Sequence, residues 1–447
     1  MLRHIPCIVI VFNFCTVFGI LAEEKPIDPA LLEKNGIVRL DGKHLTLFSD
    51  MKDKRGSIDQ LVLDESVTIF DAAAPLVADF FNVNVGRHEN WRVRAVLIEN
   101  FDTFKPTGLV DEVPKLNNGY ALKNNLWIRQ QKNDYYRRHL LLHEEVHVWM
   151  ESVFQSWGPP WYREGVAELL ATHRYQDGEL TLNVFPDHPK NFPFWGRIEI
   201  VQNAVENGKF LPVDEVLNLE PTDYNETEAY AWSWAFAAFY SNHPKYAGVA
   251  QKMPPFLKLD KNEFKKKFIE QIETKNSWHE FQNDWSDFAT NLVYGYDFER
   301  TVISDYAVGK KLSPKKPKEL SVTSEKGWQN SGIDVESGKR YRITATGRFQ
   351  LAQEPTAWWS EANGVTLRYY RGIPIGTLLV AVLPEQSAIQ TNSPEGVGFL
   401  SPKPIGTHFT GAVPQSGTLF FRINDFPSEL RDNKGTIAVT VEEIDGR

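Results

Sequence analysis

The residue types best suited to chemistry form one short cluster. His143, Glu144 and His147 make an H-E-x-x-H pattern, with two imidazoles four residues apart. On a helix, residues four apart share one face, so both imidazoles can reach one metal ion. Glu144 stands beside the first imidazole, where it would reach water on the metal rather than the metal itself. The pattern predicts zinc-assisted hydrolysis, with Glu144 as the base that takes a proton from water.

A second run of residues offers the third ligand that such a site needs. Glu164 follows His147 after a stretch of sixteen residues, and Glu168 lies four positions further on. Both carboxylates therefore share one face of an otherwise apolar helix. We expect Glu164 to bind the metal and Glu168 to accept the free ring N–H of His143 or His147. Two plainer interpretations stay open: Glu168 faces water, and the two histidines are satisfied core residues.

The run H-E-E-V-H followed by W-Y-R-E-G-V-A-E resembles the gluzincin metallopeptidases, whose third ligand lies in an E-G-x-A segment. The resemblance covers residues 36–300. The ligands and base that it implies are His143, His147, Glu164 and Glu144. Family members also use a downstream tyrosine to stabilise the oxyanion, which implies Tyr230. Tyr224 and Tyr240 are rivals, and the aromatic segment around them also suits a plain core helix.

Two departures from related families narrow the expected specificity. Aminopeptidases of the gluzincin type carry a Gly-Ala-Met-Glu-Asn stretch before the zinc helix, and its glutamate binds the substrate amine. The comparable residues 117–123 contain no acidic side chain, so a strict aminopeptidase is not expected. The strand predicted after them could still align a peptide by backbone pairing. The sequence also lacks the second downstream histidine of the metzincins, so that class of metallopeptidase is disfavoured.

The elements that must position these residues mix strands and helices. Apolar periodicity predicts a hairpin over Gly36–Phe48, a helix over Ile58–Phe81, and strands over Trp91–Ile98 and Asn125–Gln130. It then predicts helices over Tyr136–Phe154, Trp161–Arg174, Trp195–Asn207, Ala229–Ser241 and within Asn262–Tyr294. Together they predict an α+β, mostly helical catalytic domain over residues 23–308. Its N-terminal part at 36–135 is α+β, and its zinc-binding part at 136–300 is helical.

The pattern changes after residue 308. Residues 309–319 hold five lysines and two prolines, which is the composition of a linker. Residues 320–447 consist of short alternating apolar runs separated by turn residues, which predicts an all-β sandwich.

This last region resembles the calcium-dependent galactophilic lectins of the PA-I type, through the run L-F-F-R-I-N-D-F-P-S-E-L-R-D-N-K-G. The residues that match that family's calcium loop are Asp425, Asp432 and Asn433, with backbone oxygens near Leu351 and Glu429. Oxygen ligands suit Ca²⁺, whereas Asp, Asn and Gly are also what a long hairpin loop needs.

A carbohydrate ligand is one of two interpretations of the nearby aromatic residues. The family's sugar-contacting His and Gln have no clear counterparts in this sequence. Trp358, Trp359 and Tyr369–Arg371 occupy that region instead. Their rings would stack on sugars or fill the sandwich core.

The first residues predict export. An almost continuous apolar run, Ile5–Leu21, follows Arg3 and ends before the small residue Ala22, so residues 1–22 resemble a signal peptide. An uncleaved anchor is the alternative. Both cysteines, Cys7 and Cys15, lie inside this segment, so any metal in the mature chain must be held by His, Asp or Glu. No second stretch is long enough to span a bilayer.

Composition limits the partners. The chain has 447 residues and a formal net charge of −9, which gives no general electrostatic case for nucleic acid. The favoured hypothesis is an exported zinc metallopeptidase acting on a peptide or protein substrate. The alternatives are a secreted or surface binding protein with a structural or inactive metal site, and a zinc hydrolase of non-peptide amides or esters.

Overall fold

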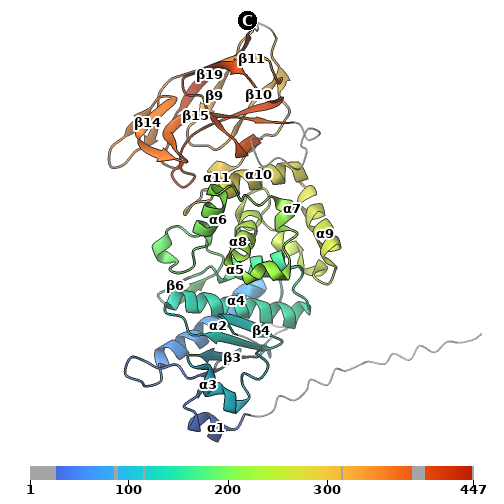
Figure 1. Cartoon of the computed structure of the whole chain (residues 1–447), viewed down its shortest axis with the longest axis vertical. Coiled ribbons are helices and arrows are strands. Elements are labelled where there is room, and N and C mark those ends of the chain that lie inside the picture. Colours follow the sequence, from blue (N-terminus) through green and yellow to red (C-terminus); the bar gives the residue numbers. More distant parts are fainter. Residues whose placement is uncertain (1–26, 85–88, 114–115, 314–315, 385–397, 445–447) are drawn as a thin grey trace, which may run out of the picture.

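The computed structural model describes residues 27–84, 89–113, 116–313, 316–384 and 398–444. Helices and strands both contribute, which confirms the α+β class in its coarser form. The N-terminal sheet, a helical layer and a pair of C-terminal sheets follow one another along the molecule (Figure 1). The predicted signal peptide at 1–22, with both cysteines, lies outside the described residues. Among the residues described, no helix is both long and apolar enough to cross a membrane.

The N-terminal strands form one five-stranded sheet in the order β1-β2-β3-β5-β4. These strands are β1 (Val38–Asp41), β2 (Leu45–Ser49), β3 (Val93–Ile98), β4 (Gly119–Leu122) and β5 (Asn125–Arg129). The three central strands are parallel, and the two outer strands run antiparallel to their neighbours. Side chains alternate between the faces, so Leu47 and Ala95 belong to one apolar core, and Phe48 and Val96 to another.

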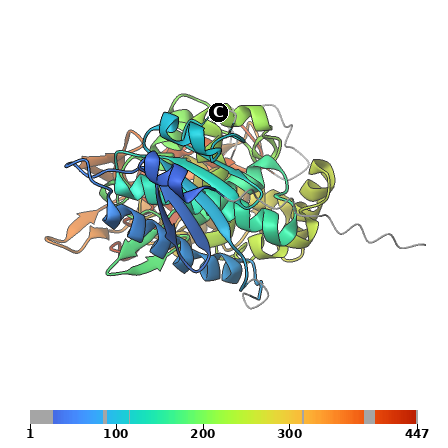
Figure 2. The same ribbon diagram turned by 90° about the horizontal axis from the view of Figure 1, so that it is seen from below.

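Helices cover the two faces of this sheet unequally. The inner face packs against two long helices, α2 (Gln60–Phe80) and α4 (Asp134–Phe154), which confirms both predicted helices. The outer face carries the short helices α1 (Pro29–Lys34), α3 (Phe101–Phe104) and η2 (Lys105–Thr107). Figure 2 shows this outer face, with short helices in front of the strands.

The helix α5 (Pro160–Ala171) follows α4 after a sharp turn. Asn133 starts α4 by accepting a hydrogen bond from the backbone N–H of Tyr136, and a proline starts α5 at its first position. The predicted end of α5 at Arg174 is wrong. Thr172 is already extended, and Arg174 begins a hairpin of β6 (Arg174–Gln176) and β7 (Glu179–Thr181).

Further helices complete the helical layer. They are η3 (Pro189–Asn191), α6 (Arg197–Glu206), α7 (Val213–Val216), η4 (Pro221–Asn225), α8 (Thr227–Asn242), η5 (Ala250–Lys252), η6 (Pro254–Phe256), α9 (Lys261–Glu273), α10 (Trp278–Thr290) and α11 (Phe298–Thr301). The almost wholly apolar α8 is buried against α5 and α6, which explains why it is hydrophobic on every side.

The C-terminal strands form two main sheets around a shared core. The first contains β8 (Lys310–Lys311), β10 (Gln329–Val335), β14 (Asn363–Tyr370), β15 (Ile373–Leu383), β16 (Lys403–Pro404) and β18 (Gly417–Ile423). The second contains β9 (Lys318–Thr323), β11 (Arg340–Thr346), β17 (His408–Ala412) and β19 (Thr436–Ile444). A small pair, β12 (Phe349–Ala352) and β13 (Trp358–Ser360), and the short η8 (Gly398–Leu400) lie beside them. Apolar side chains from both sheets share one cluster.

The helical layer and the C-terminal sheets meet at α10 through buried polar contacts. Asp287 on α10 accepts a hydrogen bond from the indole N–H of Trp328 at 3.0 Å and lies 3.6 Å from the guanidinium of Arg422. Tyr370 donates its hydroxyl to the side-chain oxygen of Asn291 at 3.0 Å. The predicted linker is paired at both ends, because β8 and the start of β9 lie within residues 309–319.

Candidate metal centre

The three proposed ligands come from two helices packed against each other. His143 and His147 lie one turn apart on α4, and Glu164 lies on α5. Their exposed fractions are 6 %, 9 % and 5 %. Gly165 permits the close packing expected beside this site, because a Cβ there would lie 2.7 Å from the carbonyl oxygen of Ser233 on α8. The local sequence thus determines both the spacing of the ligands along α4 and their burial between the packed helices.

The ligand atoms converge on one point. The Nε2 atoms of His143 and His147 are 3.1 Å apart. Each lies 3.3 Å from Oε2 of Glu164. The two imidazole planes are nearly perpendicular, at 89°. This triangle of two nitrogens and one oxygen could hold a metal ion.

The triangle suits a tetrahedral ion. Bonds of about 2.0–2.1 Å in tetrahedral geometry place neighbouring ligand atoms roughly 3.3–3.4 Å apart, close to the separations found here. Three lone-pair atoms buried at such distances repel one another unless a proton or a cation lies between them. We conclude that these residues fit a metal ion, whatever its identity.

The pKa values of the three ligand side chains are shifted because the side chains are buried and lie so close together. Burial lowers the pKa of His143, but its bond to Glu164 and the nearby carboxylates outweigh burial and raise that pKa to about 9. Burial dominates at His147, whose pKa falls below its usual value. Burial would raise the pKa of Glu164, yet the two histidines hold it well below the usual range. Glu164 is therefore an anion beside two imidazoles, as a cation site requires.

Glu144 lies beside this triangle and against strand β4. Its exposed fraction is 6 %. Burial, together with the charge of Glu164, raises the pKa of Glu144 to about 7. The carboxylate approaches the backbone of β4 so closely that a Cβ at Gly119 would overlap Oε1. A larger residue at Gly119 would push the Glu144 side chain aside, so this edge strand of the sheet helps to set the position of the proposed base.

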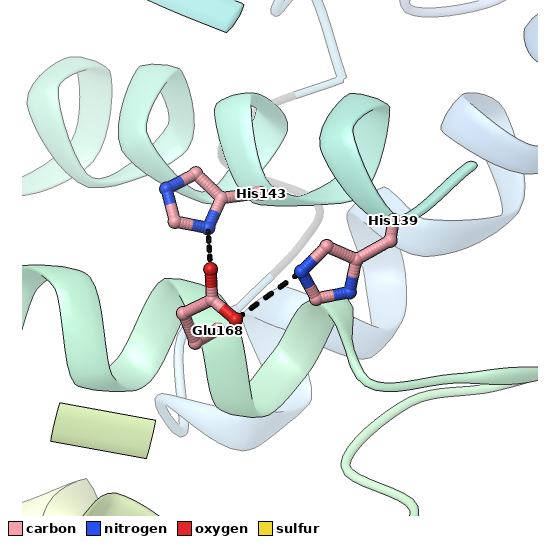
Figure 3. A group of neighbouring side chains, drawn as sticks. All are labelled: His139, His143 and Glu168. Atoms are coloured by element: carbon pink, nitrogen blue, oxygen red, sulfur yellow. Dashed lines mark ion pairs between the residues drawn. The ribbon is translucent and has the colours of Figure 1, made fainter. Parts of the chain in front are cut away.

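Glu168 holds a second layer of contacts behind the ligands (Figure 3). Its Oε2 lies 3.2 Å from Nε2 of His139, and its Oε1 lies 3.5 Å from Nδ1 of His143. Arg197 on α6 donates two hydrogen bonds to the same carboxylate, at 2.9 and 3.0 Å. Glu168 is 2 % exposed. The interpretation that it faces water is therefore wrong. Of the two ligand histidines it approaches His143, whose Nδ1 makes no hydrogen bond to it or to any other described residue.

His139, His143 and Glu168 form a second group that could hold a metal ion. A cation between them would lie beside the guanidinium of Arg197, which is bound to both oxygens of Glu168. Burial raises the pKa of Glu168, but Arg197 and His139 outweigh it and hold the carboxylate ionised. Arg197 binds both oxygens of Glu168, whereas Arg163 binds only Oε1 of Glu164 and leaves Oε2 facing the histidines, so the triangle around Glu164 is the better cation site.

The ring of Tyr230 on α8 lies beside the metal-ligand triangle, where the family resemblance places the tyrosine. Its ring centroid lies 6.2 Å from that of His143, and the guanidinium of Arg197 lies 6.0 Å from it. Burial and the carboxylates of the site raise the pKa of its phenol, so the hydroxyl keeps its proton at neutral pH. The rival Tyr224 packs edge-on against Tyr230 and binds Ser233 through its hydroxyl at 2.6 Å. The other rival, Tyr240, lies in the aromatic core beside Phe236 and Phe268.

Sequence reasoning missed three residues of this site. Arg163 donates from Nε to Oε1 of Glu164 at 2.7 Å, which leaves Oε2 facing the histidines. Arg197 and His139 brace Glu168. His139 could have been found, since it stands four residues before His143 on the same helix. Arg197 could not, because no pattern links α6 to α5 in the sequence.

The proposed calcium residues also lie close together. The backbone N–H of Phe426 donates to Oδ1 of Asp425 at 2.8 Å, and Nδ2 of Asn433 donates to Oδ2 at 3.0 Å. Among the described atoms, Oδ1 of Asp432 and Oδ1 of Asn433 are buried without a hydrogen-bond partner. Burial raises the pKa of Asp425 to about 6. Two orphaned oxygens beside a carboxylate fit a hard cation, although Asp425 is already satisfied within the loop.

Comparison with known proteins adds little. No protein-family model matches the chain. No curated protein matches it either. The N-terminal domain of EclA, a PllA-like lectin, is 19% identical and covers 28% of this chain and 95% of its own, with a TM-score of 0.21. PliG of Aeromonas hydrophila, a periplasmic inhibitor of g-type lysozyme, is 11% identical and covers 28% of this chain and 83% of its own, with a TM-score of 0.16.

At such low TM-scores neither resemblance assigns a fold or a function to this chain. The resemblance of the C-terminal region to the galactophilic lectins stays a prediction. The resemblance of the helical region to gluzincin peptidases stays a prediction.

Proposed function

We propose that this chain is an exported zinc-dependent metallopeptidase of the gluzincin type. The observation that supports the proposal best is the convergence of His143, His147 and Glu164, whose ligand atoms lie 3.1–3.3 Å apart. Glu144 stands beside them as the base, which a purely structural metal site would not need. The proposed catalytic region is the α+β and helical part at 23–308, followed by a lectin-like sandwich.

Zinc is the metal that this donor set favours. Two imidazole nitrogens and one carboxylate oxygen are typical of catalytic zinc sites, and the sequence has no cysteine after Cys15. When bound, zinc would act as a Lewis acid on a carbonyl oxygen and make water a better nucleophile.

The side chains of the chain would then do the following work. Glu144 would take a proton from the attacking water and pass it to the leaving amine. The protonated hydroxyl of Tyr230 would donate a hydrogen bond to the oxygen that gains negative charge. Arg163 would keep Glu164 in place through its 2.7 Å bond.

An extended peptide would align along β4, because β5, the strand expected in this role, is already paired on both sides with β3 and β4. The β4 strand is the last of its sheet among the described residues, so its outer backbone groups can pair with an added strand. The close approach of Gly119 to Glu144 would bring the backbone of such a peptide next to the base. Since residues 117–123 hold no acidic side chain for a free amine, cleavage within peptides fits better than strict aminopeptidase action.

Substitution of Glu144 tests the proposal. We expect Glu144→Gln to keep its zinc, measured by elemental analysis of the purified protein. Hydrolysis of a quenched peptide library should fall by about 10²–10⁴-fold, the usual contribution of a general base. The matched control is Glu145→Gln, a neighbouring buried carboxyl with no hydrogen-bond partner among the described residues. Equal activity of Glu144→Gln and the parent protein would remove the proposed base.

The C-terminal region supports a second, accessory role in binding. The orphaned oxygens of Asp432 and Asn433 favour calcium. Trp359 and Tyr369 are each 52 % exposed, so their rings are available to stack on a carbohydrate. If zinc were present without any hydrolysis of peptides, amides or esters, a binding protein with an inactive metal site would be the better assignment.

A further inference from the structure

A cavity of about 850 Å³ opens beside the N-terminal sheet, away from the metal centre. Its walls come from α1, from β1 to β3, and from the segment that leads from β2 to α2. None of the proposed metal ligands lines it. In Figure 2 this face of the sheet is nearest the viewer, and the short helices cover part of it. The α4 helix, which carries both ligand histidines, packs on the opposite face.

The cavity has an apolar wall. Leu32, Ile37 and Phe48 line it and belong to the core cluster beneath α1 and α3. Ile27, partly buried against the same cluster, extends this apolar surface. A volume of this size falls in the range of small-molecule sites, roughly 300–1,000 Å³. A hydrocarbon chain placed here would be removed from water.

The polar part of the lining is positively charged. The lining contains four cationic side chains, Arg39, Lys52, Arg92 and Arg94, against one carboxylate, Glu33. The chain as a whole carries a net charge of −9, so the cavity is opposite in sign to the protein. Such a local reversal raises the concentration of anions at the site.

The arginines make hydrogen bonds within the protein, but they can still bind a ligand. Arg39 pairs with Asp41 at 3.0 Å, and both side chains are more than half exposed, at 56 % and 54 %. Surface pairs of this kind are weak, so an anion can compete for the guanidinium. Arg92 donates from Nη1 to the carbonyls of Glu89 and Trp91, which keeps the group at the rim. Planar guanidinium groups bind carboxylates through two parallel hydrogen bonds.

We propose that this cavity binds a free single-chain anionic amphiphile, such as a medium-chain fatty carboxylate. The chain lies against the apolar wall, and the carboxylate meets the arginines at the rim. A cationic head group is repelled by the same residues. The proposal does not depend on the metal centre or on the proposed hydrolytic activity.

Titration calorimetry with laurate below its micellar concentration tests this on the full purified chain. We expect one site per chain, and no binding of dodecyltrimethylammonium, which has the same chain and the opposite charge. The double variant Arg39→Gln/Arg92→Gln should weaken laurate binding about tenfold, the loss expected for one charge-assisted contact. The matched control is Lys54→Gln, an exposed cation just outside the lining, which should bind as the parent does.

A second measurement locates the chain of the ligand. Thr46 lines the cavity and lies opposite Arg94 in the strand register. Thr46→Phe fills the space and should block laurate, and a diazirine-bearing laurate should label peptides that contain the lining residues. Equal binding by the arginine variants or by the cationic amphiphile would overturn the proposal. So would detergent-like binding at many sites, or binding to phosphatidylglycerol vesicles without saturable laurate binding.

Discussion

The molecule offers two candidate metal sites that differ in how their ligands are placed. In the helical region, α4 and α5 bring His143, His147 and Glu164 together with their ligand atoms facing one point. In the C-terminal region, a single loop brings Asp425 and Asn433 together, and there the two side chains bind each other at 3.0 Å. The first set needs a proton or a metal ion between its ligand atoms, whereas the second is partly satisfied without one.

The difference teaches how strongly each kind of element constrains a ligand set. A helix places residues four apart on one face, so the spacing of two histidines in the sequence determines how their side chains lie relative to each other. A loop fixes no such relation, and its Asp and Asn side chains also stabilise the turn itself. The residues that hold the ligand side chains in place differ as well. His143 is next to Glu168, which Arg197 and His139 hold in turn, whereas the loop residue Asn433 donates to the backbone carbonyl of Ser324 at 3.1 Å.

The sharpest way to test that support is to remove it. In the double variant Arg197→Met/Glu168→Met, both charges of the buried pair go together, so no unpaired charge is left in the core. His143 then loses the group that orients its ring, and zinc affinity should fall by about 10–100-fold. Competition with a chromophoric chelator measures the change.

A surface pair of the same chemistry provides the control. Arg174 and Asp187 also lie 3.0 Å apart, but their side chains are 48 % and 51 % exposed. The variant Arg174→Met/Asp187→Asn should leave zinc affinity unchanged. If the buried and exposed double variants bind zinc equally well, the second layer does not support the site, and the contrast with the loop loses its basis.

The sequence predicted the ligand helices well because short-range rules decide them. The apolar periodicity and the spacing of His143 and His147 placed both on one helix, as α4 confirms. Arg197 was out of reach, since it meets Glu168 only after α6 folds across α5, and no local rule reports such a contact. The approach of Gly119 to Glu144 was missed for the same reason: a strand and a helix meet there from separate parts of the chain.

The ends of helices and the strand pairing at the ends of the linker segment were predicted less well. The end of α5 was misplaced because its apolar pattern does not reveal that Thr172 turns into an extended conformation. The lysine-rich segment 309–319 indicated a linker, yet strand pairing with β10 and β19 depends on backbone groups and tolerates exposed lysines. The mixture of helices and strands was predictable, and the partners of each strand were not.

Acid should affect the two regions differently. Burial lowers the pKa of His243, between Phe239 and Tyr246 in the helical region, to about 4. The unfolded chain takes up this proton near pH 6.5, so stability present above that pH is lost as the pH falls towards 4. His408, in the C-terminal sheets, is exposed. We expect a loss of about 1.6 kcal/mol between pH 6.5 and pH 5 from His243 alone.

Urea unfolding at the two pH values, with hydrogen exchange to locate the change, measures this difference. The variant His243→Phe keeps an aromatic ring in the same packing and should reduce the pH dependence, although the buried His173, whose pKa is also lowered, still contributes. The control His408→Phe should not alter it. An unchanged slope in His243→Phe would show that this histidine does not set the acid response of the helical region.

Calcium gives the smallest expected effect and bears most directly on the loop. If the orphaned oxygens of Asp432 and Asn433 complete a site with Asp425, calcium at ten times its dissociation constant should stabilise the fold by about 1.4 kcal/mol. Asp425→Asn removes the charge but keeps the size of the side chain, so the gain should vanish, whereas Glu354→Gln, at an exposed position in the same region, should keep it. Thermal unfolding with and without calcium, at saturating zinc, separates the two sites. No calcium-dependent gain in the parent protein would mean that Asp425 and Asn433 only hold the loop together, and that the helical triangle is the metal site that the structure supports.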